Sequence, residues 1–316
     1  MKKFTALLLA FILVIGLTAC GSGTGAGNGT GSGDTSTGGI SKSSQEFIDA
    51  LNAENAEEKG VCGADLTWYY KDNVLVIKGT GPMNDYNYWF SDPDAPWYDK
   101  GLMDKIHWLI IEEGVTSIGD GAFWGIVSLS KVELPSTIET IGDGAFDNTR
   151  SLKSITIPSS VTAFGDGTFN DSSIESINIP DGIQEFGEKV FSGCNFTTLV
   201  IPDSVTRIGS GAFFGCDSLS SITIPDSVTT IGRSAFSYCG SLSSITIPSS
   251  VKELGNSAFY CSMSLTSVTF EGDAPKMEEA DSIFNKCELE QLTVTYSGSG
   301  FEPLIEAYPE INWVKK

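Results

Sequence analysis

Residues 219–239 read LSSITIPDSVTTIGRSAFSYC, and this unit of about 23 residues decides the fold because it recurs along most of the chain. One phenylalanine per unit keeps the period, at Phe123, Phe146, Phe169, Phe191, Phe213, Phe236 and Phe259. One proline per unit does the same, at Pro135, Pro158, Pro180, Pro202, Pro225 and Pro248. A period of this length indicates a stack of small units, each contacting only its neighbours, and not a globule built around one pocket.

Each unit contains one predicted strand followed by a return segment. The alternation of residues 222–224 is typical of a short half-buried strand, and Pro225 ends it because proline has no N–H to donate. We expect Val228 and Ile231 to point back into the interior and Gly232 to make a bend. The Ala-Phe pair that follows is predicted to lie on one helical turn, so that stacked units bury continuous columns of side chains.

Stacked in parallel register, these units predict a mainly β solenoid, a right-handed stack of about nine turns of 22–24 residues over residues 106–294. The last turn is less regular, and we align Leu292 in its strand with Val268 in the strand before it. Both ends of the stack need a cap, because a bare end would expose a sheet edge and apolar columns.

The N-terminal cap is expected within residues 46–105. Residues 66–70 and 74–78 predict a β-hairpin turned by Asp72 and Asn73, and residues 41–58 predict a short helix. The C-terminal cap is expected at residues 295–316, as a short helix over residues 301–308 and a closing strand over residues 311–314.

The repeated pattern L-x-x-I-x-I-P-x-S-V-T-x-I-G-x-x-A-F-x-x-C resembles the leucine-rich repeats of BspA-like bacterial surface proteins. Residues 62–68 (CGADLTW), 74–83 (VLVIKGTGPM) and 96–98 (PWY) resemble the segment that precedes the repeats in that family. The resemblance spans residues 61–316. It implies a leucine-rich repeat solenoid and a non-catalytic surface protein that binds other proteins or host surfaces, in some members as an adhesin.

The first residues predict an exported protein. Two lysines precede an apolar run at residues 6–17, which is too short to span a bilayer and is typical of a signal peptide over residues 1–19. The run ends in Leu-Thr-Ala-Cys, which resembles the lipobox of bacterial lipoproteins. That resemblance implies cleavage before Cys20, diacylation of its thiol and anchoring on the outer face of the bacterial cell membrane. The alternative is an ordinary secretory signal that happens to precede a cysteine.

The next segment and the net charge narrow the possible partners. Residues 20–45 are dominated by glycine, serine and threonine, which predicts a flexible tether behind the lipidated cysteine. The chain carries 40 acidic and 19 basic residues, a formal net charge of −21. This charge disfavours nucleic acid and direct contact with anionic lipid, so we expect a membrane contact only through Cys20. We expect a monomer whose partner is an extracellular protein or a host-surface ligand.

The outward residues of the predicted strands are the main candidate binding face. They are mostly hydroxyl side chains, which would present regular donors and acceptors to an extended ligand: Thr156, Asn178, Thr198, Ser221, Thr223, Ser244, Thr246 and Thr269. The plainer interpretation is that threonine and serine simply suit a solvated strand. Together with the resemblance described above, which implies an adhesin-like role without catalysis, this face leads us to predict a non-catalytic, adhesin-like surface lipoprotein.

A cluster of aromatic residues before the first unit offers an alternative site. Tyr86, Trp89, Trp97 and Trp108 could serve as stacking platforms for sugars, which would make the chain a glycan-binding surface lipoprotein. The other interpretation is that these rings pack the first turn as part of the cap.

No set of residues predicts catalysis or a cofactor. The single histidine, His107, has no obvious partner, and we expect no catalytic residue, no cofactor and no metal ligand set. Asp120, Asp143, Asp166 and Glu188 occupy one position in four successive units, where they either splay into solvent or bind a divalent cation between them. Cysteines that follow successive phenylalanines are expected to form one buried column of free thiols: Cys194, Cys216, Cys239, Cys261 and Cys287.

Overall fold

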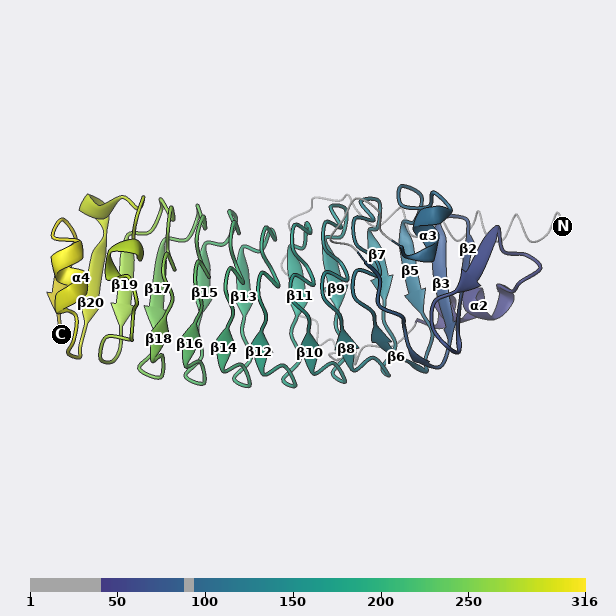
Figure 1. Ribbon diagram of the computed structural model, residues 1–316, viewed down its shortest axis with the longest axis horizontal. Coiled ribbons are helices and arrows are strands. Elements are labelled where there is room, and N and C mark those ends of the chain that lie inside the picture. The colour runs from purple at the N-terminus through teal and green to yellow at the C-terminus, as the bar shows by residue number, and fades with distance from the viewer. Residues whose placement is uncertain (1–40, 88–93) are drawn as a thin grey trace, which may run out of the picture. The chain divides into compact units, whose positions relative to one another are not determined.

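The computed structural model describes residues 41–87 and 94–316, which belong to one compact unit (Figure 1). These residues begin with helix α2 (Lys42–Ala50), the antiparallel strands β1 (Glu58–Val61), β2 (Leu66–Lys71) and β3 (Val74–Gly79), and the short helix α3 (Pro96–Asp99). From there the chain winds through about nine similar turns, as the sequence predicts.

The first strand of each turn joins a row of parallel strands. The row comprises β5 (Trp108–Ile111), β7 (Lys131–Glu133), β9 (Ser154–Thr156), β11 (Ser176–Asn178), β13 (Thr198–Val200), β15 (Ser221–Thr223), β17 (Ser244–Ile247), β19 (Ser267–Phe270) and β20 (Thr293–Tyr296). Apolar residues at the strand centres pair in order, for example Ile222 with Leu199. Hydrogen bonding is interrupted after β7, β11 and β15, so the row consists of four sheets.

A second row of parallel strands lies on the return segment, which the sequence analysis did not assign as strand. It comprises β4 (Gly81–Pro82), β6 (Val115–Ile118), β8 (Thr140–Ile141), β10 (Ala163–Phe164), β12 (Glu185–Phe186), β14 (Arg207–Ile208), β16 (Thr230–Ile231) and β18 (Glu253–Leu254). Figure 1 shows this row running beside the first. Val228 and Ile231 are buried, as predicted, because the return segment packs against the inner side of the first row.

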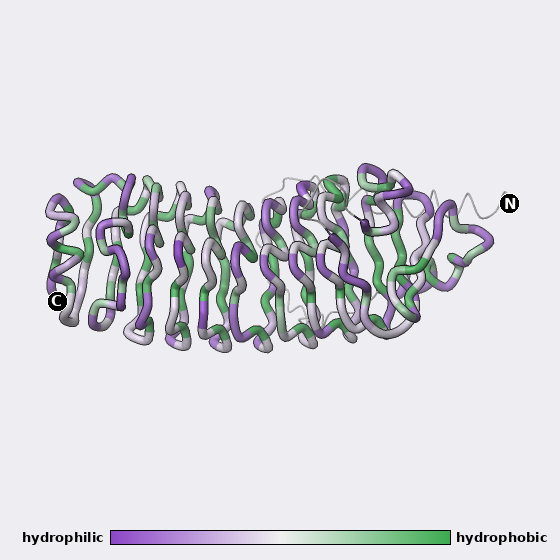
Figure 2. The backbone as a smooth tube through the Cα atoms, viewed as in Figure 1, coloured by the Kyte–Doolittle hydropathy of each residue, from purple (hydrophilic) through white to green (hydrophobic). Residues whose placement is uncertain are grey.

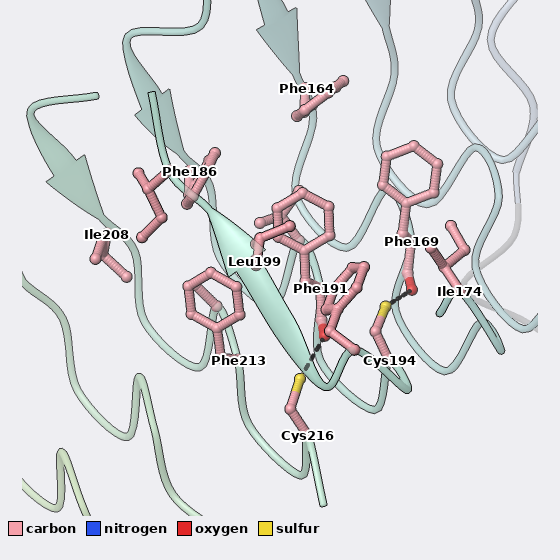
Figure 3. Close-up of a cluster of buried hydrophobic side chains, with 14 of the residues drawn as sticks. Phe164, Phe169, Ile174, Phe186, Phe191, Cys194, Leu199, Ile208, Phe213 and Cys216 are labelled. Atoms are coloured by element: carbon pink, nitrogen blue, oxygen red, sulfur yellow. Dashed lines mark hydrogen bonds between the residues drawn. The ribbon is translucent and has the colours of Figure 1, made fainter. Parts of the chain in front are cut away.

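A spine of phenylalanine rings fills the interior between the rows and the turns that close each unit. The rings stack face to face, with centroids 5.3 Å apart between Phe213 and Phe236. The centroids of Phe191 and Phe213 are 5.8 Å apart (Figure 3). Trp97 and Phe284 extend the stack at its two ends. The Ala-Phe pair lies on a hydrogen-bonded turn and not on a helix, and the Phe213 N–H donates to the carbonyl of Ala235 in the next turn at 2.9 Å.

Hydrophobic and hydrophilic segments alternate along each turn, which is the pattern that winding around one interior requires (Figure 2). One continuous core runs from Cys62 in the N-terminal cap to Ile311 near the C-terminus. Among the residues that the structure describes, no helix has the length and hydropathy to cross a bilayer.

The N-terminal cap confirms the predicted hairpin and adds one strand to it. β2 and β3 are antiparallel, and the turn residues Asp72 and Asn73 have φ of 52° and 67°, the pair of positive values that a tight hairpin favours. β1 pairs with β2 on the far side, and β3 pairs in parallel with β5, so the hairpin continues the first row. The predicted helix over residues 41–58 is present but stops at Ala50.

The C-terminal cap contains the predicted helix and strand, α4 (Glu302–Ala307) and β21 (Asn312–Lys315), and β21 pairs in parallel with β20. The predicted alignment of the last turn is wrong by two residues, because Val268 lies opposite Val294 and not Leu292. The 3₁₀ helices η1 (Ala280–Ser282) and η2 (Leu289–Gln291) take up the extra length of this turn.

Candidate functional site

We name the outward side chains of β9 to β19 the strand face. Its middle column runs in register through Thr156, Asn178, Val200, Thr223 and Thr246, and continues to Thr269. The flanking column contains Thr198, Ser221 and Ser244. All of these side chains are exposed apart from that of Thr269, which is half-buried. The structure therefore brings the predicted binding residues together on one surface.

Hydrogen bonding separates the strand-face residues into two kinds. Asn178 is held in place, because its Oδ1 accepts from the N–H of Ile157 and its Nδ2 donates to the Ile157 carbonyl, both at 2.8 Å. The hydroxyls of Thr223 and Thr246 make no hydrogen bond to other described residues, and Val200 beside them is 82% exposed. Most of the free donors and acceptors therefore lie between β13 and β19, and Thr156 on β9 adds one more exposed hydroxyl.

Helix α2 covers the N-terminal end of the same row of strands. Phe47 on α2 stacks on Trp108 with ring centroids 6.5 Å apart, and Ile110 beneath the helix is fully buried. The Lys131 ammonium lies 3.7 Å from the centre of the Trp108 ring, and the Ser41 N–H donates to the Glu133 carboxylate at 3.2 Å. The strand face that a partner can reach therefore begins at β9.

The predicted aromatic sugar platform is wrong for Trp97 and Trp108. Trp97 is fully buried, stacks on Phe123 at 5.2 Å and donates its indole N–H to the Ala122 carbonyl at 2.9 Å. The Trp108 ring is covered by Phe47 of α2 and by Lys131. Tyr86 is half-buried and donates its hydroxyl to the Cys62 carbonyl at 3.2 Å, while Trp89 lies outside the described residues. Tyr86 and Trp97 pack against each other with ring centroids 5.7 Å apart, and Trp97 forms the aromatic end of the phenylalanine stack.

The acidic ladder uses its carboxylates to hold successive turns together. The Asp120 carboxylate accepts the N–H of Asp143 at 2.7 Å, that of Asp143 accepts the N–H of Asp166 at 2.8 Å, and that of Asp166 accepts the N–H of Glu188 at 2.6 Å. Asp85 begins the series by accepting the N–H of Asp120 at 3.1 Å. In the described part of the chain, no group of three or more histidine, cysteine, aspartate or glutamate side chains could hold a metal ion. The ladder is therefore a structural series, in which each carboxylate accepts a backbone N–H from the next turn.

The buried thiols also donate hydrogen bonds to backbone carbonyls. The thiols of Cys194, Cys216 and Cys239 donate to the carbonyls of the preceding spine phenylalanines at 3.1–3.3 Å, as two dashed lines in Figure 3 show. Burial raises the pKa of Cys194 and of Cys239 to about 12, so these thiols stay protonated and unreactive. Cys261 does not belong to the predicted column, because Ser262 takes the equivalent place and donates to the Phe236 carbonyl at 2.8 Å. All cysteines among the described residues are free.

Asp147 is a carboxylate whose surroundings clearly disfavour its ionised form. Burial raises the pKa of Asp147 to about 6. A hydrogen bond from the Asn170 amide, at 3.1 Å, lowers this pKa but does not offset the effect of burial. Because the folded-state pKa lies above the ordinary value of 3.8, ionised Asp147 destabilises the native state at neutral pH.

Asp147→Asn is therefore expected to raise the free energy of unfolding at pH 7 by about 1 kcal/mol, after allowing for solvent screening of a half-buried group. The gain should shrink as the pH falls from about 6 towards 3.8, where the carboxyl becomes protonated in the folded and then in the unfolded state. Urea unfolding at several pH values measures the difference. A gain that is equal at pH 4 and pH 7 would show that the charge is not its cause.

A groove that the sequence analysis missed lies on the turns that follow the spine phenylalanines. It has a volume of about 630 Å³ and spans the turns from Asn170 to Ser234. Phe214 forms part of its wall and is 39% exposed, and its ring packs against Tyr238 at 5.1 Å, which packs against Tyr260 at 5.4 Å. We name this feature the turn-edge groove, and the three rings the aromatic strip. The signal in the sequence is an aromatic side chain one or two residues after a spine phenylalanine, with Phe214 and Tyr260 at the first position, where Asp147, Asn170 and Ser192 stand in other units, and Tyr238 at the second.

The single histidine, His107, lies in the loop before β5. It is exposed, and its Nδ1 lies 2.8 Å from the Lys105 carbonyl.

Comparison with known proteins places the repeats in a family. The sequence matches the BspA type leucine rich repeat region, in six copies, over residues 102–210 and 184–302. Together these matches span residues 102–302 of the 316 in the chain, which is more than half. No curated protein sequence matches the chain.

Solved structures of similar fold include three leucine-rich repeat proteins. One from Eubacterium ventriosum is 23% identical with a TM-score of 0.50, over 82% of this chain and 84% of that one. One from Bacteroides ovatus is 21% identical with a TM-score of 0.55, over 80% of this chain and 75% of that one. A leucine rich cell surface protein from Faecalibacterium prausnitzii is 20% identical with a TM-score of 0.42, over 83% and 96%. The first two support the fold alone. With its period, its parallel register and its phenylalanine spine, the chain belongs to the BspA-type leucine-rich repeat family.

Proposed function

We propose that the chain is a non-catalytic, adhesin-like surface lipoprotein whose strand face binds an extracellular protein or another host-surface ligand. The observation that carries this proposal is the run of unpaired hydroxyls from β13 to β19, which lie on two pairs of parallel strands, β13 with β15 and β17 with β19, and are largely open to solvent. Such a face offers regular hydrogen-bonding groups to an extended partner without any rearrangement of the backbone. The match to a family of leucine-rich repeat proteins supports a binding role in general terms.

Display at the cell surface is proposed from the sequence of the first twenty residues, which lie outside the described part of the chain. The apolar run at residues 6–17 and the Leu-Thr-Ala-Cys that ends at Cys20 support export and lipidation. The net charge of −21 favours a monomer, because two copies of the chain repel each other.

Replacing Thr223 and Thr246 together by aspartate is expected to weaken capture of a partner from host mucosal extract by at least tenfold. The two hydroxyls lie one turn apart at the centre of the strand face, and the change adds two charges where a partner must be desolvated. Affinity capture with the full chain, quantified by mass spectrometry, measures the effect.

Thr206 and Thr229 provide the matched control, since they also lie one turn apart and are exposed, but beside the second row. Their double replacement by aspartate should leave capture unchanged. Loss of capture in the control pair and not in the test pair would place the binding surface elsewhere. Turnover of a surface polymer by the purified chain would contradict the non-catalytic assignment.

A further inference from the structure

The side chains of the turn-edge groove have a composition that differs from the rest of the surface. Its walls carry acceptors from Asp171 and Glu188, donors from Lys189 and Arg233, and both from the Asn170 amide. Serines and glycines line the remainder, and no aliphatic side chain lies among the lining residues. Phe214 is the one apolar side chain among the lining residues. A ligand that fits must therefore present many groups that both donate and accept hydrogen bonds, together with one apolar face.

The charges of the groove balance. Asp171 and Glu188 are opposed by Lys189 and Arg233, although the chain as a whole carries a net charge of −21. A groove built for an anion or a cation would show an excess of the opposite sign. The balance favours a ligand without net charge.

Several side chains of the groove stand on backbone that favours glycine. Each turn has two residues with φ near +60°, and most units use glycine at the first of them, as at Gly167 and Gly211. The groove has Lys189 there instead, with φ of 52°, and Ser234 with φ of 54°; Asp171 occupies the second position with φ of 51°. A side chain other than glycine in this region costs about 1–2 kcal/mol. The turns that form the groove therefore carry polar side chains where glycine would make the fold more stable.

The aromatic strip continues the groove along the stack. The Phe214 wall packs on Tyr238, which is 41% exposed and has φ of 58°, and Tyr238 packs on Tyr260. Turns are about 4.8 Å apart at the strands. The groove and the strip together follow the stack for several turns, which suits a chain of linked units better than a single small molecule.

We propose that the turn-edge groove and the aromatic strip bind a neutral oligosaccharide. Sugar hydroxyls both donate and accept, so they match the mixed lining of carboxylates, amide, ammonium and guanidinium groups. The C–H face of a sugar ring packs on the exposed aromatic rings, as apolar groups do on phenylalanine and tyrosine. The apolar side chains of a peptide would meet only one apolar side chain among the lining residues, that of Phe214. This site is separate from the strand face.

Isothermal titration of the full chain against neutral hexasaccharides tests the proposal, in a detergent whose headgroup is not a sugar. Cellohexaose, xylohexaose, mannohexaose, maltohexaose and chitohexaose are the probes, and at least one should bind. Phe214→Ala and Tyr238→Ala should each weaken that binding about tenfold, because each removes an exposed ring. Thr223→Asp on the strand face should leave it unchanged.

Lys189→Gly separates binding from folding. It removes a polar contact from the groove and places glycine at a positive φ, so it should weaken saccharide binding while the midpoint of thermal unfolding stays the same or rises. The proposal is overturned when no hexasaccharide binds, or when binding is the same in the three groove variants as in the wild type. It is also overturned when a peptide library or heparin hexasaccharide binds in a Phe214-dependent manner and neutral saccharides do not. Loss of protein capture in the strand-face variant affects only the proposed function.

Discussion

Phe191→Ala is expected to lower the free energy of unfolding by about 3–5 kcal/mol. Phe191 is fully buried in the middle of the spine. Its ring lies within 6.2 Å of five others, those of Phe164, Phe169, Phe186, Phe196 and Phe213. Figure 3 shows it between Phe169 and Phe213. Truncation leaves a cavity that the neighbouring turns cannot readily fill, because backbone hydrogen bonds hold them in place beside the spine: the Phe191 N–H donates to the Ala212 carbonyl at 3.0 Å, and β12 pairs with β14.

Urea unfolding followed by circular dichroism measures this loss, and Phe214→Ala provides the control. The two substitutions remove the same atoms, but Phe214 is 39% exposed on the turn edge and should cost less than about 1 kcal/mol. Since each turn contacts only its neighbours, the Phe191 variant should also unfold in a less cooperative manner than the wild type. Equal losses in the two variants would contradict the role of the spine.

The repeat made most of the fold predictable. The period of the phenylalanines set the number of turns, and the alternation of residues 222–224 identified the first row, because an inward residue at every second position must face one interior. The second row escaped prediction since strands of two residues, such as β16, are too short to show a period. The last turn was misaligned because the chain between β19 and β20 includes two 3₁₀ helices that the repeat does not contain.

The candidate sites were less predictable, because exposure depends on what lies next to a side chain. The hydroxyls of the strand face follow from alternation alone. Trp97 and Trp108 were wrongly predicted as sugar platforms. The sequence shows that aromatic residues cluster before the first unit, but it does not show that Trp97 ends the phenylalanine spine or that α2 covers Trp108. The turn-edge groove arises from residues of positive φ in four successive turns, and only the structure shows that Lys189 and Arg233 line one groove.

The close approach of neighbouring turns explains why the repeat has glycine at the position of Gly232. Gly232 begins the turn, as predicted, but its φ is not among the positive values, so conformational freedom is not the reason for glycine. A Cβ at this position would lie 2.6 Å from the carbonyl carbon of Gly209 and 2.6 Å from the nitrogen of Ser210, both in the backbone of the preceding turn. Real Cβ contacts are not that short. The spacing between turns therefore depends on the absence of a side chain here.

Gly232→Ala is accordingly expected to lower the free energy of unfolding by about 3 kcal/mol, because backbone on the facing turn has to move and cannot rotate away. Gly240→Ala is the matched control. Its φ is not positive either, and a Cβ there would meet only the flexible carboxylate of Asp217 at 3.2 Å, so the change should be within about 0.5 kcal/mol. Both substitutions restrict the unfolded chain equally, so the difference between them in urea unfolding reports the clash in the folded state. If the two variants were equally stable, the turns could separate without cost, and the close stacking of backbone would not be what sets the register of the repeats.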